Sequence, residues 1–335
     1  MGSSVRVMAR LALAGILAGA SAWCSAAEGA SPAMGGQPAP LEEKPALRVP
    51  WASTEMMLGA TNAGGRLVAV GDHGVVLLSD DGGTSYRQAR SVPTRATLTA
   101  VSFADARNGW AVGQWGVIVR TRDGGETWEL QRSDTSVDQP LFTVHFSDSE
   151  HGVAAGLWSL LLVTADGGQH WKTLKLSAPP EGGPADRNLF SIFGSRSGAL
   201  FIAAEKGTVL RSTDAGASWQ YVNTGYKGSL WTGCALRDGT LLVAGLRGTV
   251  YRSTDDGQSW QPVASGTRSS ITDMVEHRGQ VMAVGLDGVQ LRSGDGGRSF
   301  SVTVRENRTD LTALGAIPGG DVRVFSVAGV AKWAE

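Results

Sequence analysis

The 335-residue sequence contains only two cysteines, Cys24 and Cys234. Cys24 lies in an N-terminal segment that resembles a cleaved leader, so the mature chain would retain one cysteine and no intramolecular disulfide. Cys234 stands in an apolar, strand-like stretch, where a lone thiol is more often a small buried hydrophobe than a nucleophile. We therefore expect packing and hydrogen bonds alone to hold the fold.

The sequence also lacks an excess of charge of either sign. Its 30 lysines and arginines oppose 31 aspartates and glutamates, and the net charge is -1. Such a chain has no global field to attract nucleic acid or anionic lipid. We expect no nucleic-acid partner, and any charge-driven recognition should be local.

Long hydrophobic runs are missing too. The apolar stretch 11–20 has about ten residues, too few to span roughly 30 Å of hydrocarbon. It follows Arg6 and Arg10 and precedes the small-residue pattern Ser25-Ala26-Ala27, so residues 1–27 are predicted to be a secretory signal peptide. Trp23 occupies the position where a lipoprotein leader needs a small residue, which disfavours lipidation. The protein is expected to be exported to the periplasm.

Known catalytic and metal-binding motifs are absent. The sequence has no G-x-S-x-G, no H-E-x-x-H and no P-loop. Its five histidines lack metal-ligand spacing: His73, His145, His151, His170 and His277. We therefore predict no catalytic residue, no metal and no cofactor.

Glycine, in contrast, is abundant, with 46 residues, roughly twice its usual share of about 7%. Residues 28–46, rich in Ala, Gly and Pro, are predicted to be a flexible tether. The folded domain is expected over residues 47–335.

An eight-residue phrase, Ser/Thr-x-Asp-x-Gly-x-x-aromatic, recurs six times in this domain. Its aspartates are Asp81, Asp123, Asp166, Asp214, Asp255 and Asp295. Its aromatic residues are Tyr86, Trp128, Trp171, Trp219, Trp260 and Phe300, spaced 40 to 48 residues apart. This period is the length of a four-stranded propeller blade. The sequence therefore predicts an all-β seven-bladed β-propeller.

Each phrase has the composition of a tight turn. The aspartate can accept hydrogen bonds from backbone N–H groups two residues on, and the Ser or Thr hydroxyl adds a second acceptor. The glycine permits a positive φ, and the aromatic ring packs against neighbouring sheet. A catalytic or metal site needs different residue types converging on one point. We therefore predict structural roles for the six aspartates.

The strand pattern of one blade is clearest in residues 97–131, where strands are expected at 97–103, 109–113, 117–121 and 127–130. The same pattern gives six complete blades and a seventh with three strands, the last over 330–333. The missing strand is expected to be Ala46–Pro50, which would complete the last blade and close the ring. Closure removes exposed sheet edges.

A longer match begins at Phe103-x-Asp105-x-x-x-Gly109-Trp110 and ends at Thr121-x-Asp123-Gly124-Gly125-x-Thr127-Trp128. It resembles the repeat of the photosystem II assembly and stability factor family. The resemblance implies an exported propeller scaffold, without enzymatic activity, that aids the assembly or stability of a membrane protein. That partner would be a photosystem II subunit in a photosynthetic cell, with the propeller in the thylakoid lumen. Related non-photosynthetic proteins imply an efflux-type transporter instead. We expect a monomer.

The eight-residue phrases resemble the repeats called Asp boxes, and we call their turns the Asp-box turns. A binding face is expected at the G-x-x-G turns between second and third strands, opposite the Asp-box turns. It would carry Trp115 and Trp158, then Lys206 and Arg247, with Arg187 and Arg268 on neighbouring connections. Aromatic residues beside arginines are typical of protein recognition. The alternative is that the rings only pack on their neighbours.

Two further alternatives remain open. Arg120, Arg211, Arg252 and Arg292 share one strand position, and would either pack locally or form an anion-binding ring. Asp boxes also occur in sialidases, and Arg48-Val49-Pro50 resembles the Arg-Ile-Pro signature of those glycosidases. Such an enzyme needs a Tyr–Glu nucleophile pair, for which Tyr221, Tyr226 and Glu205 are the candidates.

Overall fold

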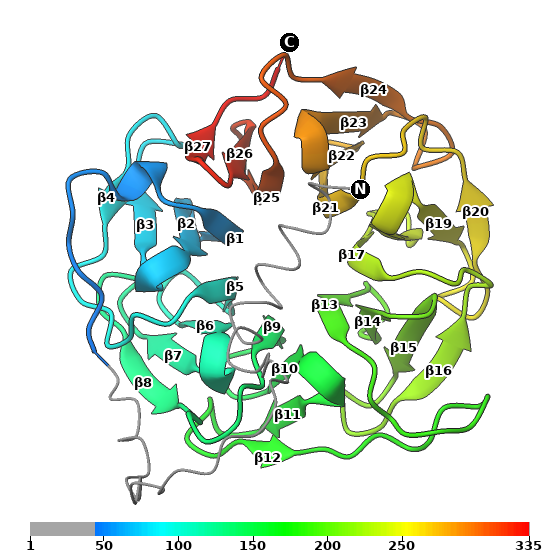
Figure 1. The fold of residues 1–335 in the computed structure, drawn as a ribbon, viewed down its shortest axis with the longest axis horizontal. Helices are drawn as coiled ribbons and strands as arrows, with labels where there is room; N and C mark the ends of the chain where they lie inside the picture. The colour runs from blue at the N-terminus through cyan, green and yellow to red at the C-terminus, as the bar shows by residue number, and fades with distance from the viewer. Residues whose placement is uncertain (1–43, 335) are drawn as a thin grey trace, which may run out of the picture. The chain divides into compact units, whose positions relative to one another are not determined.

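The computed structural model describes residues 44–334. The predicted signal peptide and residues 28–43 of the predicted tether lie outside this range. The described residues form seven antiparallel sheets arranged in a ring (Figure 1). This confirms the all-β seven-bladed propeller. The helices of residues 44–334 are single 3-10 turns, and none is long and apolar enough to cross a membrane.

Six blades have four strands, numbered from the channel outward, and the seventh has three. Blade 1 comprises β1 (Met57–Ala63), β2 (Arg66–Gly71), β3 (Val76–Ser79) and β4 (Arg87–Gln88). Blade 2 comprises β5 (Leu98–Phe103), β6 (Gly109–Gly113), β7 (Ile118–Thr121) and β8 (Glu129–Arg132). Blade 3 comprises β9 (Leu141–Phe146), β10 (Gly152–Gly156), β11 (Leu161–Thr164) and β12 (Lys172–Thr173). Blade 4 comprises β13 (Leu189–Gly194), β14 (Leu200–Ala204), β15 (Thr208–Ser212) and β16 (Gln220–Asn223).

The remaining blades follow the same order. Blade 5 comprises β17 (Leu230–Ala235), β18 (Leu241–Gly245), β19 (Val250–Ser253) and β20 (Gln261–Val263). Blade 6 comprises β21 (Ile271–His277), β22 (Gln280–Gly285), β23 (Val289–Ser293) and β24 (Ser301–Val304). Blade 7 comprises β25 (Leu311–Ala316), β26 (Val322–Ser326) and β27 (Gly329–Ala331).

The hydrophobic core lies between blades. One cluster joins Val68 and Leu78 of blade 1 to Ala111 and Val119 of blade 2, with the Asp-box ring of Trp128 beside them. A second strand such as β6 is buried along its whole length because both of its faces meet a neighbouring blade. No blade buries both faces alone, so the ring is the folding unit.

The predicted closing strand is not seen. Residues 46–50 form no strand, and they run along blade 1 instead of blade 7. The Ala46 N–H donates to the Val92 carbonyl (3.0 Å), and the Val49 N–H donates to Oε1 of Gln88 (3.1 Å). Pro45 and Pro50 lack the N–H that a sheet ladder needs, so one backbone bond and side chains hold this segment.

Blade 7 instead packs directly on blade 1. The Thr312 hydroxyl donates to the Met57 carbonyl (2.5 Å), and Nε of Arg323 donates to the Gly82 carbonyl (2.7 Å). Phe325 joins Met57 in one core cluster. The short helix η1 (Ala52–Thr54) contacts β27. The ring therefore closes by packing, without a shared sheet.

Candidate partner-binding face

In blades 1–6, the turns that join second to third strands share one backbone geometry. Each places a non-glycine residue at its tip with φ between 51° and 60°; these residues are His73, Trp115, Trp158, Lys206, Arg247 and Asp287. Five of the turns are 3-10 helices: η2 (Asp72–Gly74), η3 (Gln114–Gly116), η4 (Leu157–Ser159), η5 (Leu246–Gly248) and η6 (Leu286–Gly288). In antiparallel blades such turns lie on one face of the ring, opposite the Asp-box turns. We call it the turn face.

Hydrogen bonds to the next connection hold several tips in place. The Trp158 N–H donates to Oδ1 of Asn188 (3.1 Å), the Arg247 N–H to Oγ of Ser270 (3.1 Å). The Asp287 N–H donates to Oδ1 of Asp310 (2.8 Å). The tip backbones are thereby fixed before any partner binds, which lowers the entropy cost of association.

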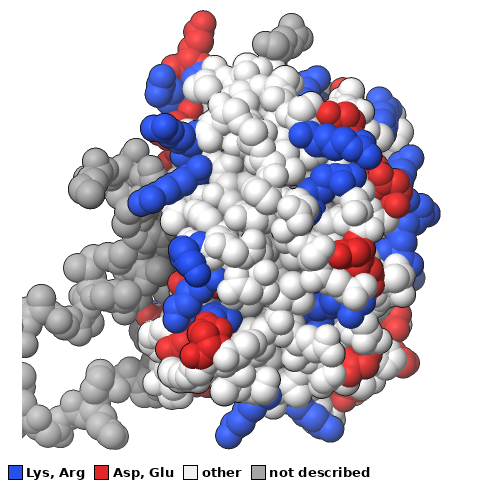
Figure 2. All heavy atoms as spheres, turned by 90° about the vertical axis from the view of Figure 1, so that its right-hand side faces the viewer, with Lys and Arg blue, Asp and Glu red and all other residues white. Residues whose placement is uncertain are grey.

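Most of the expected face residues are exposed. Trp158 exposes 57% of its surface, and Lys206, Arg247 and Arg268 are exposed as well. Trp115 is half-buried, with its ring packed on the core between blades 1 and 2. A side view shows a run of basic side chains along the middle of its left edge, with acidic side chains above and below it, and both signs on the right (Figure 2).

Arg187 corrects one expectation. Only 4% of its surface is exposed, so its side chain is not available on the turn face. The guanidinium pairs with Glu181 and lies 5.3 Å from the ring centroid of Tyr221. Glu181 lies in the connection between blades 3 and 4, outside the repeat, so the repeat could not predict this burial.

The sequence did not reveal a second component of the face, at the mouth of the central channel. Every innermost strand carries a β-bulge at its second position, where the register skips one residue. The bulged residues are Leu58, Thr99, Phe142, Phe190, Trp231, Thr272 and Thr312. They border a channel of about 250 Å³. Phe142 of blade 3 and Phe190 of blade 4 stack with ring centroids 5.6 Å apart, and we call these two rings the aromatic lip.

Deeper in the channel, Asp273 spans two blades. Its carboxylate accepts hydrogen bonds from the N–H groups of Met274 (2.8 Å) and Leu314 (2.7 Å). Desolvation raises the pKa of Asp273 to about 6 in spite of these bonds. Nearby Cys234 is buried, and its burial raises the pKa of the thiol. The buried cysteine agrees with the expectation from sequence.

The Asp boxes lie on the opposite face. Asp123 accepts the Thr121 hydroxyl (2.9 Å), the Thr127 N–H (2.9 Å) and the Thr127 hydroxyl (2.7 Å). The backbone donor is four residues on, not two as expected, and the seventh position supplies an unforeseen hydroxyl. The same bonds recur at Asp81, Asp214, Asp255 and Asp295, and His170 replaces the hydroxyl at Asp166. Each of these carboxylates thus accepts at least three hydrogen bonds within its own turn. No cluster of three potential metal ligands occurs in residues 44–334.

Arginines link five of the six Asp boxes to the blade before them. The donor is Nε or Nη1, and the acceptor is the carbonyl of the residue after the box aspartate. The pairs are Arg66–Gly124, Arg120–Gly167, Arg211–Asp256, Arg252–Gly296 and Arg323–Gly82, at 2.7 to 3.0 Å. Arg292 instead stacks on Trp333 at 4.9 Å. These contacts support local packing over an anion-binding ring.

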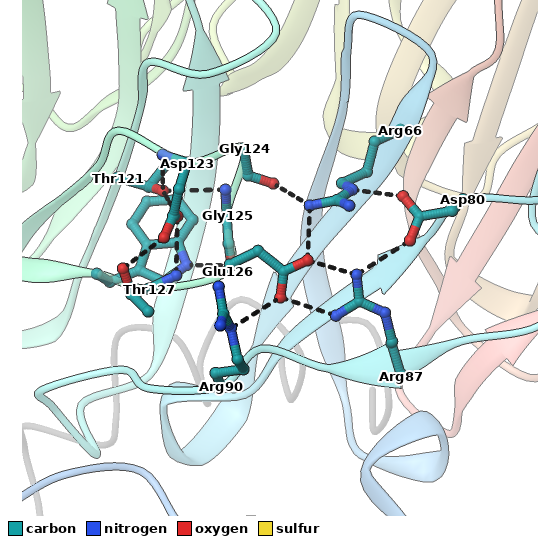
Figure 3. A network of polar contacts seen from close by, with 11 residues as sticks. Arg66, Asp80, Arg87, Arg90, Thr121, Asp123, Gly124, Gly125, Glu126 and Thr127 are labelled. Carbon is teal, nitrogen blue, oxygen red and sulfur yellow. Dashed lines mark hydrogen bonds and ion pairs between the residues drawn. The ribbon is translucent and has the colours of Figure 1, made fainter.

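The contact between blades 1 and 2 adds an ion-pair network (Figure 3). Glu126 pairs with Arg66 (3.0 Å), Arg87 (2.5 Å) and Arg90 (3.5 Å), and Asp80 bridges Arg66 and Arg87. The hydrogen bond from Arg87 holds the pKa of Glu126 below its usual value. The network is satisfied within the protein, so it is a contact between blades.

The candidates for a glycosidase site have separate partners. Glu205 accepts the N–H and Nδ2 of Asn188 at 3.0 Å each. The Tyr221 hydroxyl donates to the Ser177 carbonyl, and the Tyr226 hydroxyl donates to the Leu246 carbonyl, both at 2.9 Å. Neither tyrosine forms a hydrogen bond with Glu205 here, so the geometry does not favour the glycosidase alternative.

Residues 84–299 match the family model described as photosynthesis system II assembly factor YCF48. The chain belongs to this family. A 42-residue segment is 48% identical to the photosystem II assembly protein Ycf48 of Thermosynechococcus vestitus. A 49-residue segment is 43% identical to the chloroplastic photosystem II stability/assembly factor HCF136 of Cyanidioschyzon merolae. These matches span only 12% and 11% of the two relatives.

Solved YCF48 structures share the fold across most of the chain. One, described as YCF48 bound to D1 peptide, has a TM-score of 0.67 at 18% identity, covering 85% of this chain and 94% of its own. YCF48 from Cyanidioschyzon merolae has a TM-score of 0.65 at 17% identity, covering 85% and 96%. The YCF48 propeller is thus conserved in shape at low identity.

Proposed function

We propose that this YCF48-family propeller is an exported, non-catalytic scaffold that binds a segment of a membrane protein on its turn face and aids that protein's assembly. One observation carries the proposal. Blades 3–5 combine the aromatic lip of Phe142 and Phe190 with the exposed tips Trp158, Lys206 and Arg247. Aromatic anchors beside basic groups are typical of protein-recognition hot spots.

Family membership supports the kind of partner. A structural neighbour in this family is described as bound to D1 peptide, and by likeness we assign this chain a membrane-protein segment exposed in the same compartment. The predicted leader at residues 1–27 supports export. In a photosynthetic cell the compartment would be the thylakoid lumen, and in other bacteria the periplasm.

The chemistry of blades 3–5 favours a segment with both apolar and acidic side chains. The rings of the lip can bury apolar groups near the ring axis, while Lys206, Arg247 and Arg268 surround it with exposed positive charge. Rim charges of this type raise the association rate and make it sensitive to salt.

The test measures binding of a fluorescently labelled D1 peptide by anisotropy. Trp158→Ala combined with Lys206→Glu and Arg247→Glu should weaken binding at least tenfold. Trp158 is the residue chosen for substitution, and Trp115 is left unchanged because its half-buried ring also packs on the core. The control is Arg122→Glu with Arg298→Glu, which changes the charge near the Asp-box turns. Unchanged affinity in the triple variant would exclude the turn face.

A further inference from the structure

The outer edge of blade 7 is open. Its sheet has the order β25–β26–β27, and no strand within residues 44–334 pairs with the outer side of β27. In every other blade a fourth strand occupies this place. A cavity of about 990 Å³ lies here, bordered by Val330 and Ala331 of β27, the first Asp-box turn and blade 6. We call it the blade 7 groove.

The groove is basic. Arg278, Arg292, Arg323 and Lys332 line it, together with His277, and its only lining acid among the described residues is Asp321. Arg323 already donates to the Gly82 carbonyl, and Arg278 to that of Gly319. Arg278, Arg292 and Lys332 remain exposed. The local field therefore favours an acidic occupant.

The groove also has an apolar floor with an unused donor. Met282, Trp333 and Tyr86 line it, and the Tyr86 ring packs edge-on against Phe325 with centroids 6.1 Å apart. The Tyr86 hydroxyl is buried and has no hydrogen-bond partner among the described residues. A buried unpaired hydroxyl is costly, so a ligand acceptor at this position would be favoured.

We propose that the blade 7 groove accepts an extended acidic segment of a partner protein, which adds to β27 as the fourth strand of the blade. Strand addition satisfies an open sheet edge through main-chain hydrogen bonds, and alternate side chains provide specificity. The groove is a different surface from the turn face, so a test of peptide binding in the groove does not depend on whether the proposed function is correct.

Charge complementarity identifies the occupant as acidic, and the sheet geometry identifies it as extended. The fourth strands of the other blades have two to four residues. A matching partner segment therefore needs about four residues in β conformation, with carboxylates placed to meet Arg278, Arg292 and Lys332. Its alternate apolar side chains would cover Met282 and Trp333.

The probe is an acetylated, amidated hexapeptide that alternates glutamate and valine, labelled for anisotropy. It should bind the full chain and slow amide exchange of residues 329–333. A copy with lysine in place of glutamate, and a copy with alternate backbone nitrogens methylated, should bind at least tenfold more weakly. These two peptides separate the charge requirement from the strand requirement.

The groove variant is Arg278→Glu with Lys332→Glu, which should weaken binding of the glutamate peptide at least tenfold. The matched control, Arg122→Glu with Lys172→Glu, reverses two exposed charges in other blades and should bind normally. The turn-face triple variant should bind normally too. Equal binding of the methylated peptide, or peptide-dependent protection outside residues 329–333, would each overturn the proposal.

Discussion

At the residue scale, the second strand of blades 1, 2, 3, 5 and 6 ends in a glycine whose backbone passes very close to the residue before the innermost strand. A Cβ added to Gly113 would lie 2.0 Å from the Thr97 carbonyl oxygen. The φ of Gly113 is -178°, an extended value that any residue can adopt. Glycine is therefore required here for the close approach, not for the conformation.

Gly113→Ala should destabilise the protein by at least about 3 kcal/mol, because two backbone segments would have to separate. Gly294→Ala is the matched control, since a Cβ there meets nothing within 4 Å. That substitution should change stability by less than about 0.5 kcal/mol. Chemical denaturation measures both, and similar midpoints for the two variants would contradict the close contact.

The six Asp-box aspartates should make the free energy of unfolding depend on pH. Burial raises the pKa of Asp255, but hydrogen bonds from Ser259 and Ser253 outweigh burial and lower this pKa to about 2. In an unfolded chain the pKa of an aspartate is about 3.9. A lowered folded-state pKa stabilises the fold above about pH 4, and this contribution disappears as the pH falls toward 2.

Asp255→Asn should therefore cost about 0.5–1 kcal/mol at neutral pH, a small value because solvent screens the site. The difference from the parent protein should shrink between about pH 4 and pH 2. Urea unfolding at pH 7, 4 and 2 measures it, with Glu306→Gln, an exposed acid on a connection, as control. A difference that is constant with pH would show that the carboxylate charge is not involved.

Some of this residue-scale detail could be predicted from sequence. The Asp-x-Gly pattern indicated a turn stabilised by the aspartate. The conserved hydroxyl at the seventh position, such as Thr127 or Ser259, was visible in the repeat and would have identified the second carboxylate partner. Burial of Arg187 was not predictable, because its ion-pair partner Glu181 lies on a connection without a repeat.

At the element scale, adjacent blades are joined by arginines that reach the next Asp-box turn. Arg120 is buried, donates to the Gly167 carbonyl (3.0 Å) and lies 5.1 Å from the Trp110 ring centroid. The Gly167 carbonyl also accepts bonds from Nε1 of Trp110 (3.1 Å) and Nε2 of Gln131 (3.0 Å). It therefore keeps partners if the arginine is removed.

Arg120→Met should cost only about 1–2 kcal/mol, the loss of one hydrogen bond and one cation–π contact. Arg120→Ala should cost more, because it also leaves space beside Trp110. Thermal unfolding of the two variants gives the ranking. The apolar Val163 at the equivalent position of blade 3 supports tolerance of methionine, and an equal loss in both variants would contradict this account.

The repeat predicted the element order well, because each strand has the same apolar pattern and each turn the same glycines. It could not predict which blade the arginines contact, since the acceptors are backbone carbonyls without a sequence pattern. The β-bulges at Phe142, Phe190 and Trp231 could not be predicted from the sequence either. A bulge depends on how the inner strand bends around the channel, not on its composition.

At the scale of the whole ring, the contact between blades 7 and 1 depends on packing, the Thr312–Met57 hydrogen bond and the Arg323–Gly82 hydrogen bond. The sequence predicts Ala46–Pro50 as the missing strand of blade 7, because this blade has only three strands of its own. The Gln88 side chain, which binds both Val49 and Leu47, places it on blade 1 instead. A long-range contact of this kind has no local pattern.

Blade 7 should accordingly be the least protected blade in amide hydrogen exchange, because it has three strands and an open edge. Thr312→Val combined with Arg323→Met should accelerate exchange in β25–β27 and β1 while blades 3–5 stay unchanged. Exchange read by mass spectrometry distinguishes the regions. Equal acceleration around the whole ring would mean that the blades open together, and not at this seam.

The shared left-handed tips accept different side chains. Histidine, tryptophan, lysine, arginine and aspartate already occupy the same backbone conformation at this position. One side chain per blade can therefore be exchanged at this position while the backbone beneath keeps its conformation.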